Sequence, residues 1–149
     1  MTQLVNTTAH AAARQAARQA ASLALADAGA GNSSVRLYTA AGGTLLAVRT
    51  LSKPCGTVGA GPDHRITLAW ADTAEVALAT GAATWGEWCN GSGVAISAGR
   101  VTDPDGNYTD GTGAVVPDPA GVGPFVLGGS TGTMVYAGGL VLLYAGLIG

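Results

Sequence analysis

Few side chains in this 149-residue sequence are suited to acid–base or nucleophilic chemistry. The only histidines are His10 and His64. His64 lies between Asp63 and Arg65, but adjacent residues in a turn point in different directions, so proximity in sequence does not make this trio a catalytic unit. The sequence contains no GxSxG, no HExxH and no phosphate-binding glycine motif. We therefore predict a non-enzymatic protein with no catalytic residues.

The best candidate for metal binding is the stretch DPDGNYTD, residues 103–110. Oxygen-bearing side chains at alternate positions are what Ca²⁺ prefers. However, Gly106 falls between the second and third oxygen-bearing residues, and no glutamate closes the loop at its twelfth position, so the stretch is not an EF-hand. Asp-Pro and Asp-Gly are also ordinary turn sequences. We predict turns, no metal and no cofactor, with calcium as the alternative.

Tryptophans could serve in a core, an interface or a sugar-binding surface. In a strand over WGEWC, residues 85–89, Trp85 shares one face with Glu87 and Cys89, while Trp88 lies on the other. One of the two should therefore be in the core. The other, together with Trp70, could stack on a sugar or anchor an interface.

The composition places this chain outside the range of an ordinary enzyme domain. It has 24 glycines, 11% charged residues and a net charge of −2, whereas a typical domain is about 25% charged and about 7% glycine. Seven basic residues against nine acidic ones cannot neutralise a row of phosphates, so we predict no nucleic-acid partner. Cys55 and Cys89 lack the spacing of a zinc site or a disulfide scaffold, and we expect both thiols to be buried and unpaired.

The elements that must position these residues begin with a helix over residues 8–28. Ala, Arg, Gln and Leu are good helix formers, Thr7 or Thr8 can cap the start, and Gly29 and Gly31 can end it. One side of the helix carries a stripe of small side chains, Ala9, Ala12, Ala13, Ala16, Ala20, Leu23 and Ala24, with Arg14 and Arg18 beside it. We predict that residues 1–31 form a docking arm, and that the body folds without residues 1–28.

After Gly31 the sequence changes to short β-type runs. We predict strands at 35–40, 44–51, 66–71, 75–80, 83–89, 94–97, 123–127, 133–136 and 140–144, with tight turns at 41–43 and 90–93. Two Gly/Pro/Asp-rich stretches, 52–65 and 102–121, are predicted to be long loops. The expected fold is mainly β: a compact β-sandwich or barrel over residues 32–149, preceded by the Ala-rich helix.

The C-terminal stretch 134–149 carries no charge. It is shorter than the roughly 20 residues of a membrane-spanning helix and is interrupted by glycines, so we predict a buried strand and no membrane partner. Alternation places Leu140, Leu142 and Tyr144 on one side and Val141 and Leu143 on the other. Both sides are apolar, so we expect the domain core to cover one and a subunit or capsid contact to cover the other.

Three segments resemble small structural proteins encoded in the capsid modules of tailed bacteriophages: GNSSVRLYTAAGGTLLAVRTL, ATGAATWGEWCNGSGVAI and YAGGLVLLYAGLI. The resemblance covers residues 29–149 and implies a head decoration, or cement, protein. It implies binding to the major capsid protein, self-association into a homo-oligomer, and a place on the virion surface after assembly in the bacterial cytoplasm.

Candidate interface residues under this hypothesis are Arg14, Arg18, Leu23, Trp88 and Leu143. The alternatives are a tail or connector component, a glycan-binding module that recognises the host surface, and a hydrolase. Two tryptophans exposed on one face would favour glycan binding, whereas their burial would favour a structural role.

Overall fold

The computed structural model describes residues 5, 7–71, 74–144 and 147–148, with side chains as far as Tyr144. Within these residues the chain folds into a helix followed by strands: α1 (Thr8–Ala26), β1 (Ser34–Tyr38), β2 (Leu45–Val58), β3 (Ile66–Trp70), β4 (Gly81–Ala82), β5 (Trp85–Cys89), β6 (Ala95–Thr102), β7 (Asn107–Thr109), β8 (Val115–Pro117), β9 (Phe125–Gly128), β10 (Met134–Val135), β11 (Leu142–Leu143) and β12 (Leu147–Ile148). The prediction of a mainly β fold after one N-terminal helix is confirmed.

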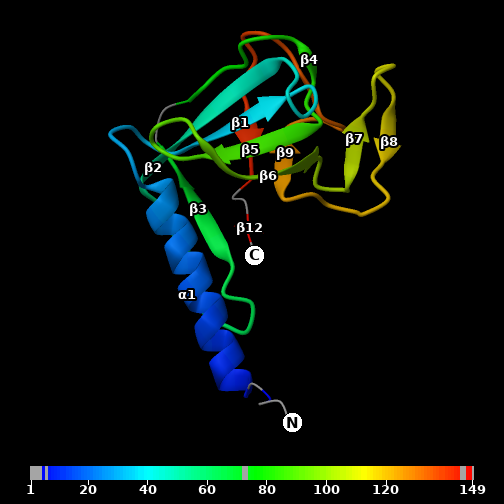
Figure 1. Cartoon of the computed structure of the whole chain (residues 1–149). Coiled ribbons are helices and arrows are strands. Elements are labelled where there is room, and N and C mark those ends of the chain that lie inside the picture. The colour runs from blue at the N-terminus through cyan, green and yellow to red at the C-terminus, as the bar shows by residue number, and fades with distance from the viewer. Residues whose placement is uncertain (1–4, 6, 72–73, 145–146, 149) are drawn as a thin grey trace.

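The main sheet has the strand order β11-β9-β6-β5-β1-β2-β3-β12 and curls into a half-barrel (Figure 1). Its strand pairs are antiparallel except β6 and β9, which run parallel. β11 and β12 lie at opposite edges of this sheet, yet they are close neighbours in sequence. Leu143, the end of β11, and Leu147, the start of β12, are four residues apart in sequence. Their Cα atoms can therefore be roughly 14 Å apart at most, so the curl must bring the two edges of the sheet near each other.

Helix α1 begins at a capped turn and leaves most of its surface in solvent. The Oγ1 of Thr7 accepts a hydrogen bond from the His10 N–H at 3.2 Å, which confirms the predicted cap. The helix lies alongside the β2–β3 hairpin, and its N-terminal end points away from the rest of the sheet (Figure 1). The less exposed side chains recur at helical spacing, namely Ala12, Gln15, Ala16, Gln19, Ser22, Leu23 and Ala26. Only part of the predicted stripe of small residues therefore faces the sheet.

The core forms on the inner side of the curled sheet. It is one cluster drawn from the whole body, with Val35, Leu37, Leu46, Leu51, Ile66, Leu68, Trp88, Val101, Phe125, Leu127, Val141 and Leu143 among its members. Close packing also explains a glycine in β5, because a Cβ at Gly86 would lie 2.6 Å from the ring of Phe125. Ala26 is fully buried in this cluster, so the end of the helix belongs to the body.

The predicted long loop at 52–65 is wrong over its first half. β2 continues to Val58, and only residues 59–65 connect it to β3. Pairing with β3 shifts register between Leu51 and Gly56, so the intervening residues bulge out of the ladder. A bulge tolerates Pro54, which has no N–H to donate to a neighbouring strand.

The predicted loop at 102–121 is also wrong, because it contains the β7–β8 hairpin, with Asn107 opposite Pro117 and Thr109 opposite Val115. The predicted strand at 75–80 is not formed. The N–H groups of Leu78 and Ala79 both donate to the Leu46 carbonyl, so this segment crosses β2 instead of pairing with it in register. The β1–β2 hairpin and the 90–93 turn form as predicted.

Candidate interaction surfaces

The His64 region is a surface turn. The His64 backbone has a φ of 42°, in the left-handed region, and its Nδ1 lies 3.2 Å from the Gly59 carbonyl oxygen. Asp63 and Arg65 form an exposed ion pair at 3.8 Å that does not involve the imidazole. Across the described residues, no group of three or more His, Cys, Asp or Glu side chains converges on a possible metal position.

The carboxylates of the 103–110 stretch stabilise turns. Asp103 is buried, and its carboxylate accepts hydrogen bonds from the backbone N–H groups of Asp105, Asn107 and Gly132 at 2.8–3.0 Å. Burial opposes ionisation of this carboxyl, but these hydrogen bonds outweigh it and hold the pKa of Asp103 below its usual value. Asp110 accepts from Thr112 and Ala114 in a separate turn, and these bonds lower its pKa as well.

The same turn recurs at four places in the described chain, a pattern that sequence reasoning missed. Each begins with Asn or Asp, whose Oδ1 accepts the N–H of the residue two positions on, and has a glycine in the fourth position with φ between 75° and 86°. A glycine adopts this left-handed backbone without steric cost. The turns start at Asn90, Asp103, Asp110 and Asp118. The available signal was the spacing [Asn/Asp]-x-x-Gly in the sequence.

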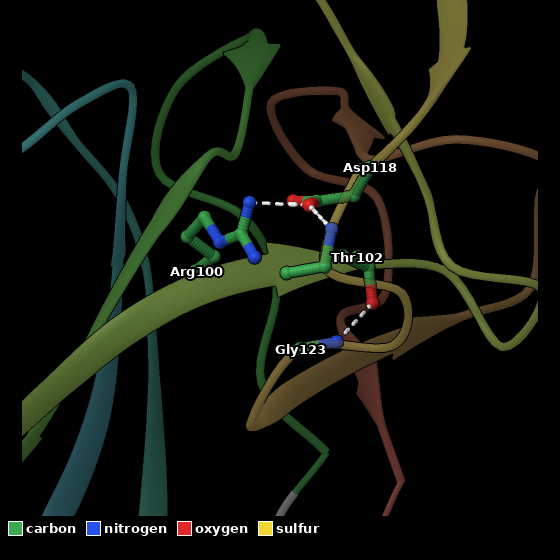
Figure 2. A network of polar contacts seen from close by, with 5 residues as sticks. Arg100, Thr102, Asp118 and Gly123 are labelled. Carbon is green, nitrogen blue, oxygen red and sulfur yellow. Dashed lines mark hydrogen bonds and ion pairs between the residues drawn. The ribbon is translucent and has the colours of Figure 1, made fainter.

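The 103–121 segment follows β6 directly and is fastened back to it near its C-terminal end. Figure 2 shows Arg100 paired with the carboxylate of Asp118, whose side chain is only 2% exposed. The Asp118 N–H donates to the Gly106 carbonyl, and the Gly123 N–H donates to the Thr102 hydroxyl at 2.9 Å. This segment is a fixed part of the body and does not have the form of a loose contact arm.

The tryptophans are not arranged as a sugar-binding platform. Trp88 is buried, and its indole N–H donates to the Ser33 hydroxyl at 2.9 Å. Trp70 is half-buried, with the guanidinium carbon of Arg49 5.6 Å from its ring centroid. Trp85 is also half-buried, and β1 and β2 separate its strand from that of Trp70. These positions favour the structural role over glycan binding.

Both cysteines are buried and unpaired. Burial raises the pKa of the Cys55 thiol to about 12, with the charge of Asp27 and a hydrogen bond to its carboxylate adding to the effect. Burial also raises the pKa of Cys89. Neither thiol is suited to nucleophilic chemistry near neutral pH.

The structure separates the five residues predicted to lie at an interface. Arg14 and Arg18 are exposed on α1, and Leu23 is partly buried where the helix crosses Gly56 of β2. Trp88 and Leu143 are 1% and 9% exposed. The chain's own core accounts for the burial of these last two side chains, so the structure corrects their assignment to an interface.

A candidate surface is built from two segments that lie against each other. The Ala77 N–H donates to the Gly139 carbonyl, the Gly138 N–H donates to the Ala77 carbonyl, and Val76 and Leu140 form an isolated β-bridge. We call the large side chains exposed along these segments the C-terminal apolar face. It consists of Val76, Leu78, Tyr136, Leu140, Leu142 and Tyr144, which are 47–67% exposed.

This face includes a half-open groove of about 240 Å³. Leu127, Met134, Tyr136, Leu140 and Leu142 are among the residues that line it. Small-molecule sites are usually about 300–1,000 Å³ in volume. The groove is therefore better matched to one or two side chains of a partner than to a ligand.

The core covers one side of the C-terminal strand, as expected, and the predicted partner on its other side stays a prediction. The predicted alternation is present, with Val141 and Leu143 turned into the core and Leu140, Leu142 and Tyr144 turned outward. The outward side is in solvent, because no other segment of the described chain crosses it. Within residues 140–144, regular pairing is limited to Leu142 and Leu143, which pair with β9.

Comparisons with known protein families, curated proteins and solved structures each find no match to this chain. None of the helices among the described residues is long and apolar enough to cross a membrane.

Proposed function

We propose that this chain is a non-enzymatic structural protein of a tailed-phage virion, a decoration protein that binds the major capsid protein shell. The observation that carries the proposal is the projecting half of α1, residues 8–18, which we call the arm. It runs beside the β2–β3 hairpin, away from the rest of the sheet, and exposes Ala9, Ala13, Arg14, Ala17 and Arg18. Small side chains let another backbone approach closely, so this surface suits docking along a flat or grooved partner.

The charge distribution supports the same use of the arm. Residues 1–26 contain Arg14 and Arg18 and no acidic residue, whereas residues 27–149 contain five basic and nine acidic side chains. The arm is thus the basic end of a chain whose body carries a net charge of −4. Such a distribution orients the arm towards an acidic partner surface and keeps the body away from it.

The polar groups of the body support a non-enzymatic role. Asp103, Asp110 and Asp118 are used in turns, and Glu75 accepts hydrogen bonds from the Thr50 N–H and hydroxyl at 2.5 Å. These groups stabilise the scaffold. A rigid body with one projecting basic helix fits a protein whose task is attachment.

The proposal is tested by mixing the purified chain with capsid shells that lack it, from the phage that encodes it, and sedimenting the shells. We expect saturable binding in a fixed ratio to capsid subunits, lost when residues 1–18 are deleted. Saturation at a few copies per particle, or binding only to isolated tails, would instead indicate the tail or connector alternative. No binding to any virion part would refute the proposal.

A further inference from the structure

We propose that the C-terminal apolar face is the contact between two copies of this chain. No residue of the arm contributes to this face. The inference extends the proposed function by naming a second partner, and the contact itself does not depend on capsid binding.

The first argument is area. The six large side chains of the face are 47–67% exposed, so together they supply a large part of the roughly 800 Å² that each partner buries in an interface of standard size. Contiguous exposed apolar patches of this size on soluble monomers are often functional. The partly exposed Met134 beside the groove can supply part of the remainder.

The second argument is charge. None of the six residues is ionisable near neutral pH, so two identical faces can approach across a two-fold axis without like-charge repulsion. Glu75 is the carboxylate nearest to this face in sequence. It accepts hydrogen bonds from the Thr50 N–H and hydroxyl and lies 3.7 Å from the guanidinium of Arg49. A charged partner would find no complementary group among the six, whereas a second copy needs none.

The third argument is shape. The face combines a half-open groove lined by Tyr136, Leu140 and Leu142 with exposed side chains, including Tyr144, beside it. Exposed Leu and Tyr side chains of one copy can enter the groove of the other, which gives both partners the same gain in burial. The backbone hydrogen bonds between 77 and 138–139 hold the face in place, so little ordering is required on association.

A two-fold contact here would give the particle-bound protein two arms. Two linked arms bind with a higher effective concentration than one, so weak individual contacts can produce firm attachment. This consequence, unlike the contact itself, rests on the proposed function.

The test compares three purified chains by sedimentation equilibrium: wild type, Leu142→Asp and Val122→Asp. Leu142 and Val122 are both 55% exposed, but Val122 lies outside the face and serves as the matched control. We expect wild type and Val122→Asp to dimerise from the 14.5 kDa monomer at micromolar concentrations. Leu142→Asp should raise the dissociation constant at least about tenfold and keep the wild-type circular dichroism spectrum.

A second set of measurements uses a chain in which Arg14 and Arg18 are replaced with Glu. These changes should leave dimerisation unaltered, even if they abolish shell binding, so failure of one proposal is distinguishable from failure of the other. A wild-type chain that remains monomeric at about 100 µM would overturn the inference. Equal dimerisation of Leu142→Asp and wild type would also overturn it, because the contact would then lie elsewhere.

Discussion

The arm and the C-terminal apolar face are both exposed, but they differ in side-chain size, charge and anchoring. The arm offers methyl groups and two arginines on the exposed side of a helix that lies along the β2–β3 hairpin. The face offers six large uncharged side chains on segments tied together by backbone hydrogen bonds. A small-residue basic helix selects a partner by close approach and charge, whereas a large apolar face selects by buried area. The two surfaces should therefore respond differently to mutation and to salt.

The largest effect is expected where the apolar face meets the core. Leu143 follows the exposed Leu142 in β11 and points to the opposite, buried face, so Leu143→Asp places an uncompensated carboxylate in the core. We expect a loss of several kcal/mol in unfolding free energy, enough to unfold the body. Leu143→Ala should cost about 2–5 kcal/mol. Chemical denaturation followed by circular dichroism measures both, and a Leu143→Asp chain as stable as Leu142→Asp would contradict the assigned orientation of this segment.

A smaller effect is expected at Asp103, whose carboxylate binds the Gly132 N–H two residues before β10. Asp103→Ala leaves buried donors without a partner and should cost about 1–3 kcal/mol. Because the pKa of Asp103 is lower in the folded chain, its carboxylate stabilises the fold above the usual aspartate range. That contribution is lost as the pH falls through the lowered pKa.

Denaturation midpoints measured from pH 7 down to about pH 2 check this pH dependence. The wild type should lose stability more steeply than Asp103→Ala below about pH 4. Parallel curves for the two chains would show that Asp103 does not carry the effect. Asp110→Ala is the control for an exposed turn carboxylate.

Removing the arm should have a still smaller effect on the body. Deleting residues 1–18 removes partly buried alanines, at about 0.8 kcal/mol for each methyl group that is fully buried, so we expect a cost of roughly 1–2 kcal/mol. Deleting residues 1–28 also removes the buried Ala26 and Asp27, whose carboxylate accepts from the Cys55 N–H at 3.0 Å.

Alkylation of Cys55 distinguishes these two truncations. The thiol should remain unreactive at pH 8 in the 1–18 deletion, as in the intact chain, and become reactive in the 1–28 deletion because the cover over β2 is lost. Rapid alkylation in the shorter deletion would mean that the arm itself protects the body, and that the boundary between arm and body is misplaced.

The smallest effect on stability is expected from replacing Arg14 and Arg18 with Glu. Both side chains are exposed, so the unfolding free energy should change by less than about 0.5 kcal/mol for each. Shell binding should weaken, and its salt dependence should reverse, because the two glutamates replace an attraction to an acidic surface by a repulsion that salt screens. If this double replacement leaves shell binding unchanged, the charge of the arm does not contribute to binding.

The sequence was sufficient for elements with strong local signals. The Ala-rich helix, its Thr7 cap, the β1–β2 hairpin and the alternation of residues 140–144 all depend on propensity or period and are present as predicted. Pro54 led to the wrong prediction of a loop, because a proline usually excludes a central strand. Only the register shift between Leu51 and Gly56 reveals the bulge that accommodates this proline.

The candidate surfaces could not be predicted in the same way, because they depend on long-range contacts. The exposure of Leu142 beside the burial of Leu143 required knowledge of which side of β11 meets the core. Val76 and Leu140 are far apart in the sequence, and only the β-bridge between them in the structure shows that they belong to one surface. The fixed form of the 103–121 segment depends on the pair Arg100–Asp118, which no local pattern indicates.

The copy number of this chain in purified virions tests the central claim most directly. Quantitative mass spectrometry, with the major capsid protein as the internal reference, gives the ratio of the two chains in intact particles of the encoding phage. A decoration protein should be present in hundreds of copies, in a simple ratio to the capsid protein. A handful of copies, or none, would contradict the account and would place the protein in the tail, in the connector or outside the virion.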